Sequence, residues 1–290
     1  MAVIVAIVFT FVVLFLVLGY LIDFRFDFRR PDVSPLQGRR NYLRGCGPFE
    51  FGTGDRAVMF LHGIAGSPAQ VKDVAKRLAA DGFHVYGVVL PGHGTDPEDL
   101  FGITWQRWYE HVVAEHGRIL ERHGKVSVAG FSLGAALGMR LAMEHPVEKL
   151  ICISVSSSRL FHDYLPSHWL LRAASFLSSS ARTFPQRLPE TEDGPEYLIY
   201  RSIPMDALNT LVDLVHDNEP RLGDVKVPTL VIHSKKDVAS RPTGAQLLYD
   251  RLGTEEKRLV WFESAPHGLM HGSDEDKAIL HHEIVDFLAN

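Results

Sequence analysis

The stretch that most constrains the fold of this chain is the pentapeptide Gly130-Phe131-Ser132-Leu133-Gly134. It follows the mostly apolar run Val126–Ala129 and opens a stretch of small residues with helical character, Ala135–Met139. A glycine at each end indicates a turn so tight that a side chain there would collide with neighbouring backbone. The sequence therefore predicts that a buried strand turns sharply into a helix, with the Ser132 hydroxyl presented at the carboxyl end of a sheet.

Composition excludes several classes of function. The 290 residues are 46% apolar and 22% charged, which is typical of a globular protein with one large domain or two small ones. The net charge of −5 argues against nucleic-acid binding, which usually needs a basic face. Cys46 and Cys152 lack the spacing of metal ligands, so we expect no metal site and no cofactor, with a single bridge between the two cysteines left open.

The first segment departs from this globular composition. Residues 2–22 carry no charged side chain, and a helix of 21 residues spans a hydrocarbon core of about 30 Å. No Lys or Arg precedes this run, and Gly19–Ile22 is a poor cleavage site, so we interpret it as a retained membrane anchor. Cleavage and secretion are the alternative. Arginines follow the span, which predicts that the remaining chain lies on the cytoplasmic side of the membrane.

After the anchor, residues 23–54 contain several prolines and glycines and are interpreted as a linker, with Phe49–Phe51 as a short edge strand. From residue 55 to residue 290, short apolar runs alternate with segments of helical periodicity. This alternation predicts an α/β domain with a doubly wound, mostly parallel sheet. The last helix is expected near 273–288, with Ile279 and Ile284 in the core. The strands are expected at 57–61, 84–90, 126–129, 150–155, 227–233 and 258–262.

The interval 156–222 breaks the alternation of strands and helices. It contains serine clusters, several prolines and amphipathic patches, of which 202–214 is the clearest helix. An insertion of this length at the carboxyl edge of a sheet is usually functional, so the sequence predicts a helical lid over a site. The alternative is a packing excursion without a functional role.

A serine hydroxyl is a weak nucleophile that needs a base, and the base needs a group that orients it. In hydrolases with this strand–turn–helix motif, the serine is followed along the chain by an acid and then by a histidine. Asp237 follows the predicted strand 227–233, and His267 follows the predicted strand 258–262. Both therefore fall at the same sheet edge as Ser132. We expect Ser132 as nucleophile, His267 as base and Asp237 as the orienting carboxylate.

Two further features complete this predicted site. Glu263 is an alternative partner for His267, although it is too close in sequence to reach easily around the imidazole ring. The tetrahedral oxyanion of acyl transfer needs two hydrogen-bond donors, one from the residue after the nucleophile and one from the loop after the first long strand. The backbone N–H groups of Leu133 and Ile64 occupy these two positions and are the predicted donors.

Five stretches of the sequence resemble the α/β-hydrolase serine esterases, in particular carboxylesterases and monoacylglycerol lipases. They are Phe60–Pro68, Leu90–Thr95, Gly130–Gly134, Asp237-Val238 and Pro266–Gly268. The resemblance covers about residues 55–288 and implies the α/β-hydrolase fold. It also implies the roles already assigned to Ser132, Asp237, His267, Ile64 and Leu133. The family often has an aromatic residue after the His-Gly pair, where this chain has Ile64, so the wall of the acyl pocket is expected to differ.

Residues and resemblance together predict a membrane-anchored serine hydrolase that cleaves carboxylic esters through an acyl-enzyme. The expected apolar lid and the anchor favour a lipid-derived substrate, such as a monoacylglycerol or another short-to-medium acyl ester. A thioesterase, lysophospholipase or amidase would use the same triad. The alternative from a different class is a non-catalytic binding protein of the same fold.

Overall fold

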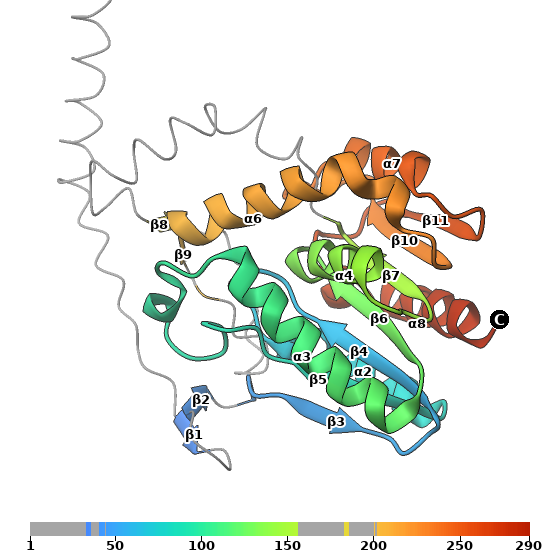
Figure 1. Ribbon diagram of the computed structural model, residues 1–290, viewed down its shortest axis with the longest axis horizontal. Helices are drawn as coiled ribbons and strands as arrows, with labels where there is room; N and C mark the ends of the chain where they lie inside the picture. Colours follow the sequence, from blue (N-terminus) through green and yellow to red (C-terminus); the bar gives the residue numbers. More distant parts are fainter. Residues whose placement is uncertain (1–32, 36–40, 44, 156–182, 186–199, 201) are drawn as a thin grey trace, which may run out of the picture.

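The computed structural model describes residues 33–35, 41–43, 45–155, 183–185, 200 and 202–290 (Figure 1). The predicted anchor at 2–22, much of the linker and most of the predicted lid at 156–222 fall outside these residues. Within the described part of the chain, no helix combines the length and the apolar character that crossing a membrane requires.

A sheet of seven strands forms the centre of the described part (Figure 1). The strands are β3 (Phe49–Phe51), β4 (Arg56–Leu61), β5 (Phe83–Val88), β6 (Val126–Phe131), β7 (Leu150–Ile153), β10 (Thr229–Ser234) and β11 (Lys257–Phe262). Their order in space is β11-β10-β7-β6-β4-β5-β3, and every neighbouring pair is parallel except β3 with β5. The mostly parallel sheet and the edge strand predicted from the sequence are confirmed.

Helices cover both faces of this sheet (Figure 1). One face carries α3 (Trp105–His123), α4 (Leu133–Glu144), α6 (Met205–Asn218) and α7 (Pro242–Arg251), and the other carries α2 (Lys72–Ala80) and α8 (Asp274–Ala289). In the described ranges, four 3-10 turns connect these elements: η1 (Pro68–Val71), η2 (Pro97–Leu100), η6 (Glu219–Asp224) and η7 (Leu269–His271). Among the described residues, two small antiparallel pairs lie outside the sheet: β1 (Val33–Pro35) with β2 (Asn41–Leu43), and β8 (Thr183–Pro185) with β9 (Ser202–Pro204).

The central strands are apolar on both sides because both faces of the sheet are covered. In β6, Val126 and Val128 belong to the core cluster under α3 and α4. Ala129 and Phe131, which alternate with them, belong to the cluster under α2 and α8. Since successive side chains of a strand point to opposite faces, one short run contributes to two cores. This explains why the strands appear in the sequence as continuous apolar runs.

Two details differ from the sequence-based expectation. Residues 202–204 form the strand β9, and helix α6 begins only at Met205. Pro204 accounts for this, because proline disfavours the helical conformation for the residue before it. In α8, Ile284 is buried as expected, but Ile279 is 42% exposed and Leu280 is buried in its place. The expected core face of this helix was therefore wrong by one residue at Ile279.

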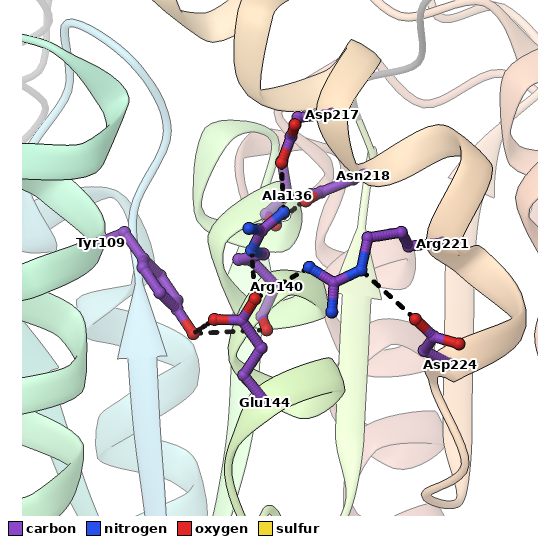
Figure 2. Close-up of polar contacts among 8 residues, drawn as sticks. All are labelled: Tyr109, Ala136, Arg140, Glu144, Asp217, Asn218, Arg221 and Asp224. Carbon is purple, nitrogen blue, oxygen red and sulfur yellow. Dashed lines mark hydrogen bonds and ion pairs between the residues drawn. The ribbon is translucent and has the colours of Figure 1, made fainter.

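Polar side chains tie α6 to α4, the helix that follows Ser132 (Figure 2). The guanidinium of Arg140 on α4 is mostly buried and forms ion pairs with Glu144, at 2.8 Å, and with Asp217 on α6. Arg221 in η6 contacts the same Glu144 carboxylate at 2.8 Å, and the Tyr109 hydroxyl donates to it at 2.6 Å. Burial and this carboxylate raise the pKa of Tyr109, which keeps its hydroxyl protonated as a donor.

A buried amide reinforces this connection at the beginning of α4. The Nδ2 group of Asn218, which is 2% exposed, donates to the carbonyl of Ala136 at 2.8 Å (Figure 2). Ala136 lies one turn after Ser132. The described end of the predicted lid interval is thus packed and hydrogen-bonded directly onto α4, the helix that begins one residue after this serine.

Candidate active site

Ser132 lies in a strained turn between the last residue of β6 and the first residue of α4. Its φ of 52° and ψ of −109° are rare for a residue with a side chain. Its N–H donates to the carbonyl of Ile153 on β7 at 2.9 Å, and its carbonyl accepts from the N–H groups of Ala135 and Ala136. These bonds fix the sharp strand-to-helix turn that the pentapeptide predicts.

The two glycines of the pentapeptide are required by close backbone approaches. A Cβ atom at Gly130 would overlap the backbone of Gly134. A Cβ atom at Gly134 would overlap the carbonyl oxygen of Leu61 on the neighbouring strand β4. Since both obstacles are main-chain atoms, no side-chain rotation relieves them. The interpretation of these positions as obligatory glycines is confirmed.

Asp237 and His267 lie together at the same edge of the sheet. The Nδ1 atom of His267 donates to Oδ2 of Asp237 at 2.7 Å. The other carboxylate oxygen, Oδ1, accepts from the backbone N–H groups of Ala239, at 2.9 Å, and Ser240, at 2.7 Å. The Asp237 side chain has no exposed surface, whereas the His267 side chain is 26% exposed. This arrangement fixes the imidazole in the tautomer whose Nε2 is free of hydrogen and can take up a proton.

Glu263, the alternative partner for His267, has a different contact. Its carboxylate pairs with the Lys235 ammonium at 2.6 Å, and both side chains are at least half exposed. The structure therefore brings His267 to Asp237.

Serine hydroxyls that the sequence analysis did not single out hold the strand ends in place. Ser154, which follows β7 with a φ of 47°, donates to the carbonyl of His267 at 2.6 Å. Ser234 donates to the carbonyl of Ala265 at 2.5 Å, and Ser240 donates to the carbonyl of Val155. Each bond joins the carboxyl end of one strand, or the loop after it, to the loop that follows another strand. A serine directly at a strand's carboxyl end, as at Ser154 and Ser234, is the signal that could have pointed to them.

The turn after β4, which carries Ile64, is fixed by its neighbours. The Gly63 N–H donates to the buried side chain of Gln70 at 3.1 Å. The carbonyl of Ala65, a residue with a φ of 56°, accepts from the Tyr200 N–H at 2.8 Å. Ile64 lies between these two anchored residues and is half-buried. Gln70 and Tyr200 are supporting residues that carry no motif in the sequence.

His62 shapes this turn through hydrogen bonds. Its Nε2 accepts from the N–H of Leu90 at 3.0 Å, and its Nδ1 donates to the carbonyl of Gly63 at 2.8 Å. Burial lowers the pKa of His62 to about 4. His93 packs edge-on against it at 4.9 Å between ring centroids, and burial also holds the pKa of His93 well below its usual range. Both histidines are neutral structural groups near neutral pH.

Phe131 connects this turn with His267. Its ring centroid lies 5.1 Å from that of His267. On the other side, a Cβ atom at Gly63 would come within 2.9 Å of the Phe131 ring. The missing side chain at residue 63 thus makes room for a ring that packs beside the imidazole.

The predicted site residues occupy one edge of the sheet. Leu133 is the first residue of α4, so its N–H has no acceptor within the helix. Across the ranges that the structure describes, no group of three or more His, Cys, Asp or Glu side chains could hold a metal ion.

Comparisons with known proteins agree with this fold. Residues 52–274 match the model of the family Hydrolase_4, described as "Serine aminopeptidase, S33". A carboxylesterase of Bacillus subtilis (strain 168) is 25% identical over 243 residues, which cover 83% of this chain and 95% of the relative. A thermostable monoacylglycerol lipase of Bacillus sp. (strain H-257) is 25% identical over 250 residues, which cover 85% and 96%.

Solved structures show the same similarity. A structure from work on the metagenome-derived lipolytic enzymes LipS and LipT superimposes with a TM-score of 0.75 and 27% identity, covering 86% of this chain and 99% of the other. A soluble variant of monoglyceride lipase from Saccharomyces cerevisiae superimposes with a TM-score of 0.66, covering 89% and 94%. At 12% identity, this second likeness is one of fold alone.

The glycine contacts give a prediction for stability. We expect Gly134→Ala to lower the free energy of unfolding by about 3 kcal/mol or more, because the new methyl group meets the Leu61 carbonyl. Gly117→Ala in α3 is the matched control, since its Cβ meets nothing within 4 Å and alanine favours the helix by up to about 1 kcal/mol. Urea unfolding of the two variants measures both effects. Equal stability of the two variants would contradict the packing argument.

The buried His62 gives a prediction for pH dependence. Between pH 6.5 and pH 4 the unfolded chain binds a proton at residue 62 that the folded protein excludes, so the free energy of unfolding falls as the pH falls. A pKa lowered from 6.5 to about 4 corresponds to about 3 kcal/mol over this window. Urea unfolding at several pH values should show that the free energy of unfolding depends less steeply on pH in His62→Gln than in the wild type. His282→Gln, on the exposed side of α8, is the control and should keep the wild-type pH dependence. A wild-type pH dependence in His62→Gln would refute the prediction.

Proposed function

The chain belongs to the α/β-hydrolases of the Hydrolase_4 family and is related to carboxylesterases and monoacylglycerol lipases, and on that premise we propose that it is a serine hydrolase of carboxylic esters. The observation that carries this proposal is the 2.7 Å hydrogen bond between His267 and the buried Asp237, at the sheet edge where Ser132 lies in its strained turn. Backbone strain of this kind is concentrated at functional sites.

In the proposed reaction, the Ser132 Oγ attacks the ester carbonyl carbon while Nε2 of His267 takes the hydroxyl proton. Asp237 stabilises the imidazolium that forms. The tetrahedral intermediate then collapses, the bond to the alcohol oxygen breaks, and His267 gives its proton to that oxygen. A water molecule, deprotonated by the same Nε2, then attacks the carbonyl carbon of the acyl-enzyme. The bond from this carbon to the Ser132 Oγ breaks, the acid is released, and His267 gives its proton to the Ser132 oxygen.

We assign the stabilisation of the oxyanion to the N–H groups of Leu133 and Ile64. Leu133 begins α4, where the unpaired N–H groups of a helix carry partial positive charge. Ile64 lies in the turn that Gln70 and Tyr200 hold. One donor of this kind typically contributes about 3 kcal/mol to the stability of the transition state.

The proposed substrate is a lipid-derived ester with an apolar acyl chain, such as a monoacylglycerol. The relatives named as a carboxylesterase and a monoacylglycerol lipase support this class. We further propose a domain order of an anchor at 2–22, a linker at 23–54 and a hydrolase domain at 55–290, with a lid at about 156–222. In this layout the anchor holds the catalytic domain at a membrane surface, on its cytoplasmic side, where lipid esters are concentrated.

A second candidate is the hydrolysis of amides, which the description of the matching family as a serine aminopeptidase favours. The same three side chains would act, with His267 protonating a leaving amine instead of an alcohol. Rates on p-nitrophenyl esters and on aminoacyl p-nitroanilides of similar size distinguish the two. Higher kcat/KM for the anilides would assign the protein to amide hydrolysis.

Two substitutions test the proposed roles. Ser132→Ala should lower kcat for p-nitrophenyl ester hydrolysis by at least about 10⁴-fold, because the nucleophile is absent. Asp237→Asn should lower kcat by about 10⁴-fold, because an amide at this position stabilises the wrong tautomer of His267. Glu263→Gln is the matched control and should leave kcat unchanged, since Glu263 pairs with Lys235.

Hydrolysis that survives Ser132→Ala would rule out the nucleophile. A loss of activity in Glu263→Gln together with a normal Asp237→Asn enzyme would transfer the orienting role to Glu263.

A further inference from the structure

A second histidine, His233 at the carboxyl end of β10, lies beside Asp237. Both side chains are completely buried, and Nε2 of His233 lies 3.5 Å from Oδ2 of Asp237. The same Nε2 is 2.8 Å from the carbonyl of Ser240. Oδ2 is also the oxygen that accepts the hydrogen bond from His267. One carboxylate oxygen therefore lies between two imidazoles, of which only that of His267 is partly exposed.

The hydrogen-bond partners determine the tautomer of His233. A backbone carbonyl only accepts, so Nε2 of His233 carries the hydrogen and directs it to Ser240, with Oδ2 of Asp237 as a longer second acceptor. Nδ1 is buried and has no hydrogen-bond partner among the residues that the structure describes. A second proton on this ring would be buried at Nδ1 without an acceptor, which is costly. The geometry thus favours a neutral ring with its hydrogen on Nε2.

The surroundings of His233 also favour a neutral imidazole. The Trp261 ring of β11 packs edge-on against the imidazole, with 6.0 Å between centroids. Burial lowers the pKa of His233, although Asp237 and the bond to Ser240 oppose this shift. The charged side chains on the neighbouring strand ends, Lys235, Lys236 and Glu263, are exposed. Of the two imidazoles, only that of the partly exposed His267 is therefore placed to form an ion pair with the Asp237 carboxylate.

We infer that His233 is a positioning residue for the Asp237–His267 pair. Its Nε2–H holds the carbonyl of Ser240, whose own N–H binds Oδ1 of Asp237. The loop Asp237–Ser240 is thereby closed around the carboxylate, and Oδ2 is aimed at His267. This inference rests on the proposed function, in which His267 is the base. Errors of about 1 Å in the placement of a catalytic group cost on the order of 100-fold in rate, so a support of this kind has a measurable effect.

Three variants separate positioning from mere packing. His233→Leu removes the N–H donor and keeps an apolar side chain in the buried site. His233→Gln carries an amide N–H near the position of the imidazole Nε2. His116→Leu is the matched control, because it also removes a buried imidazole, on α3 beside His145 and Pro146.

The first measurement is the NMR spectrum of the imidazole groups of His267 and His233 in the full protein. In the wild type, we expect His233 to be neutral with its hydrogen on Nε2, and the Nδ1 proton of His267 to appear at the low field of a short hydrogen bond to a carboxylate. In His233→Leu, this Nδ1 proton signal should move upfield or broaden by exchange, because a less well placed carboxylate accepts a weaker hydrogen bond. His233→Gln and His116→Leu should keep the wild-type Nδ1 proton signal of His267.

The second measurement is the pH profile of p-nitrophenyl ester hydrolysis, normalised to the sites that react with a fluorophosphonate. His233→Leu should lower kcat by about 10-fold to 100-fold with little change in KM, and the acid limb of kcat/KM should move to lower pH. His233→Gln should recover most of this loss, which a purely structural role would not produce.

The outcomes distinguish the two proposals. A wild-type protein that hydrolyses no ester would overturn the proposed esterase function, while the NMR spectra would still decide the role of His233. An unchanged Nδ1 proton signal of His267 in His233→Leu would overturn the positioning role. If His233→Leu does not fold, a wild-type His233 that carries its hydrogen on Nδ1, or hydrogens on both ring nitrogens, near neutral pH would overturn it equally.

Discussion

The site depends on a buried negative charge, the carboxylate of Asp237. A charge without exposed surface is stable only where hydrogen bonds replace its water. Two backbone N–H groups of its own loop bind one oxygen, and His267 binds the other. The serine bonds between the carboxyl ends of different strands and the bond from His233 to Ser240 hold these donors in place. Pairing this charge therefore organises the loops after β7, β10 and β11 around one imidazole.

The opposite side of the site depends on a steric constraint. Because Gly134 packs directly against the carbonyl of Leu61, α4 begins immediately beside β4, and Ser132 is held at a φ that is rare for a residue with a side chain. The same approach places the first turn of α4 against Leu61, the last residue of β4, after which the turn with Ile64 follows. Packing of α6 onto α4, through Arg140 and Asn218, keeps this helix in position. Strain at Ser132 is thus balanced by packing on both ends of the turn.

Much of the fold was predictable because it follows from local patterns. Apolar runs gave the parallel strands, and the glycines gave the sharp turn at Ser132. Chain order alone left Asp237 and Glu263 as partners of His267, and only the folded loops decide between them. His233, Gln70 and Ser240 carry no sequence signal, because their roles arise from contacts between distant segments. Helical periodicity also gave two wrong details. Pro204 shifts the start of α6 to Met205, and Leu280 is buried where Ile279 was expected in the core.

The proposed role of Ser132 as an activated nucleophile is tested by treating the folded protein with a fluorophosphonate and locating the adduct by peptide mass spectrometry. We expect one adduct, on Ser132, that forms rapidly in the wild type and much more slowly when Asp237 is replaced by Asn. A folded protein that forms no adduct, or that carries it on another serine, would contradict this role.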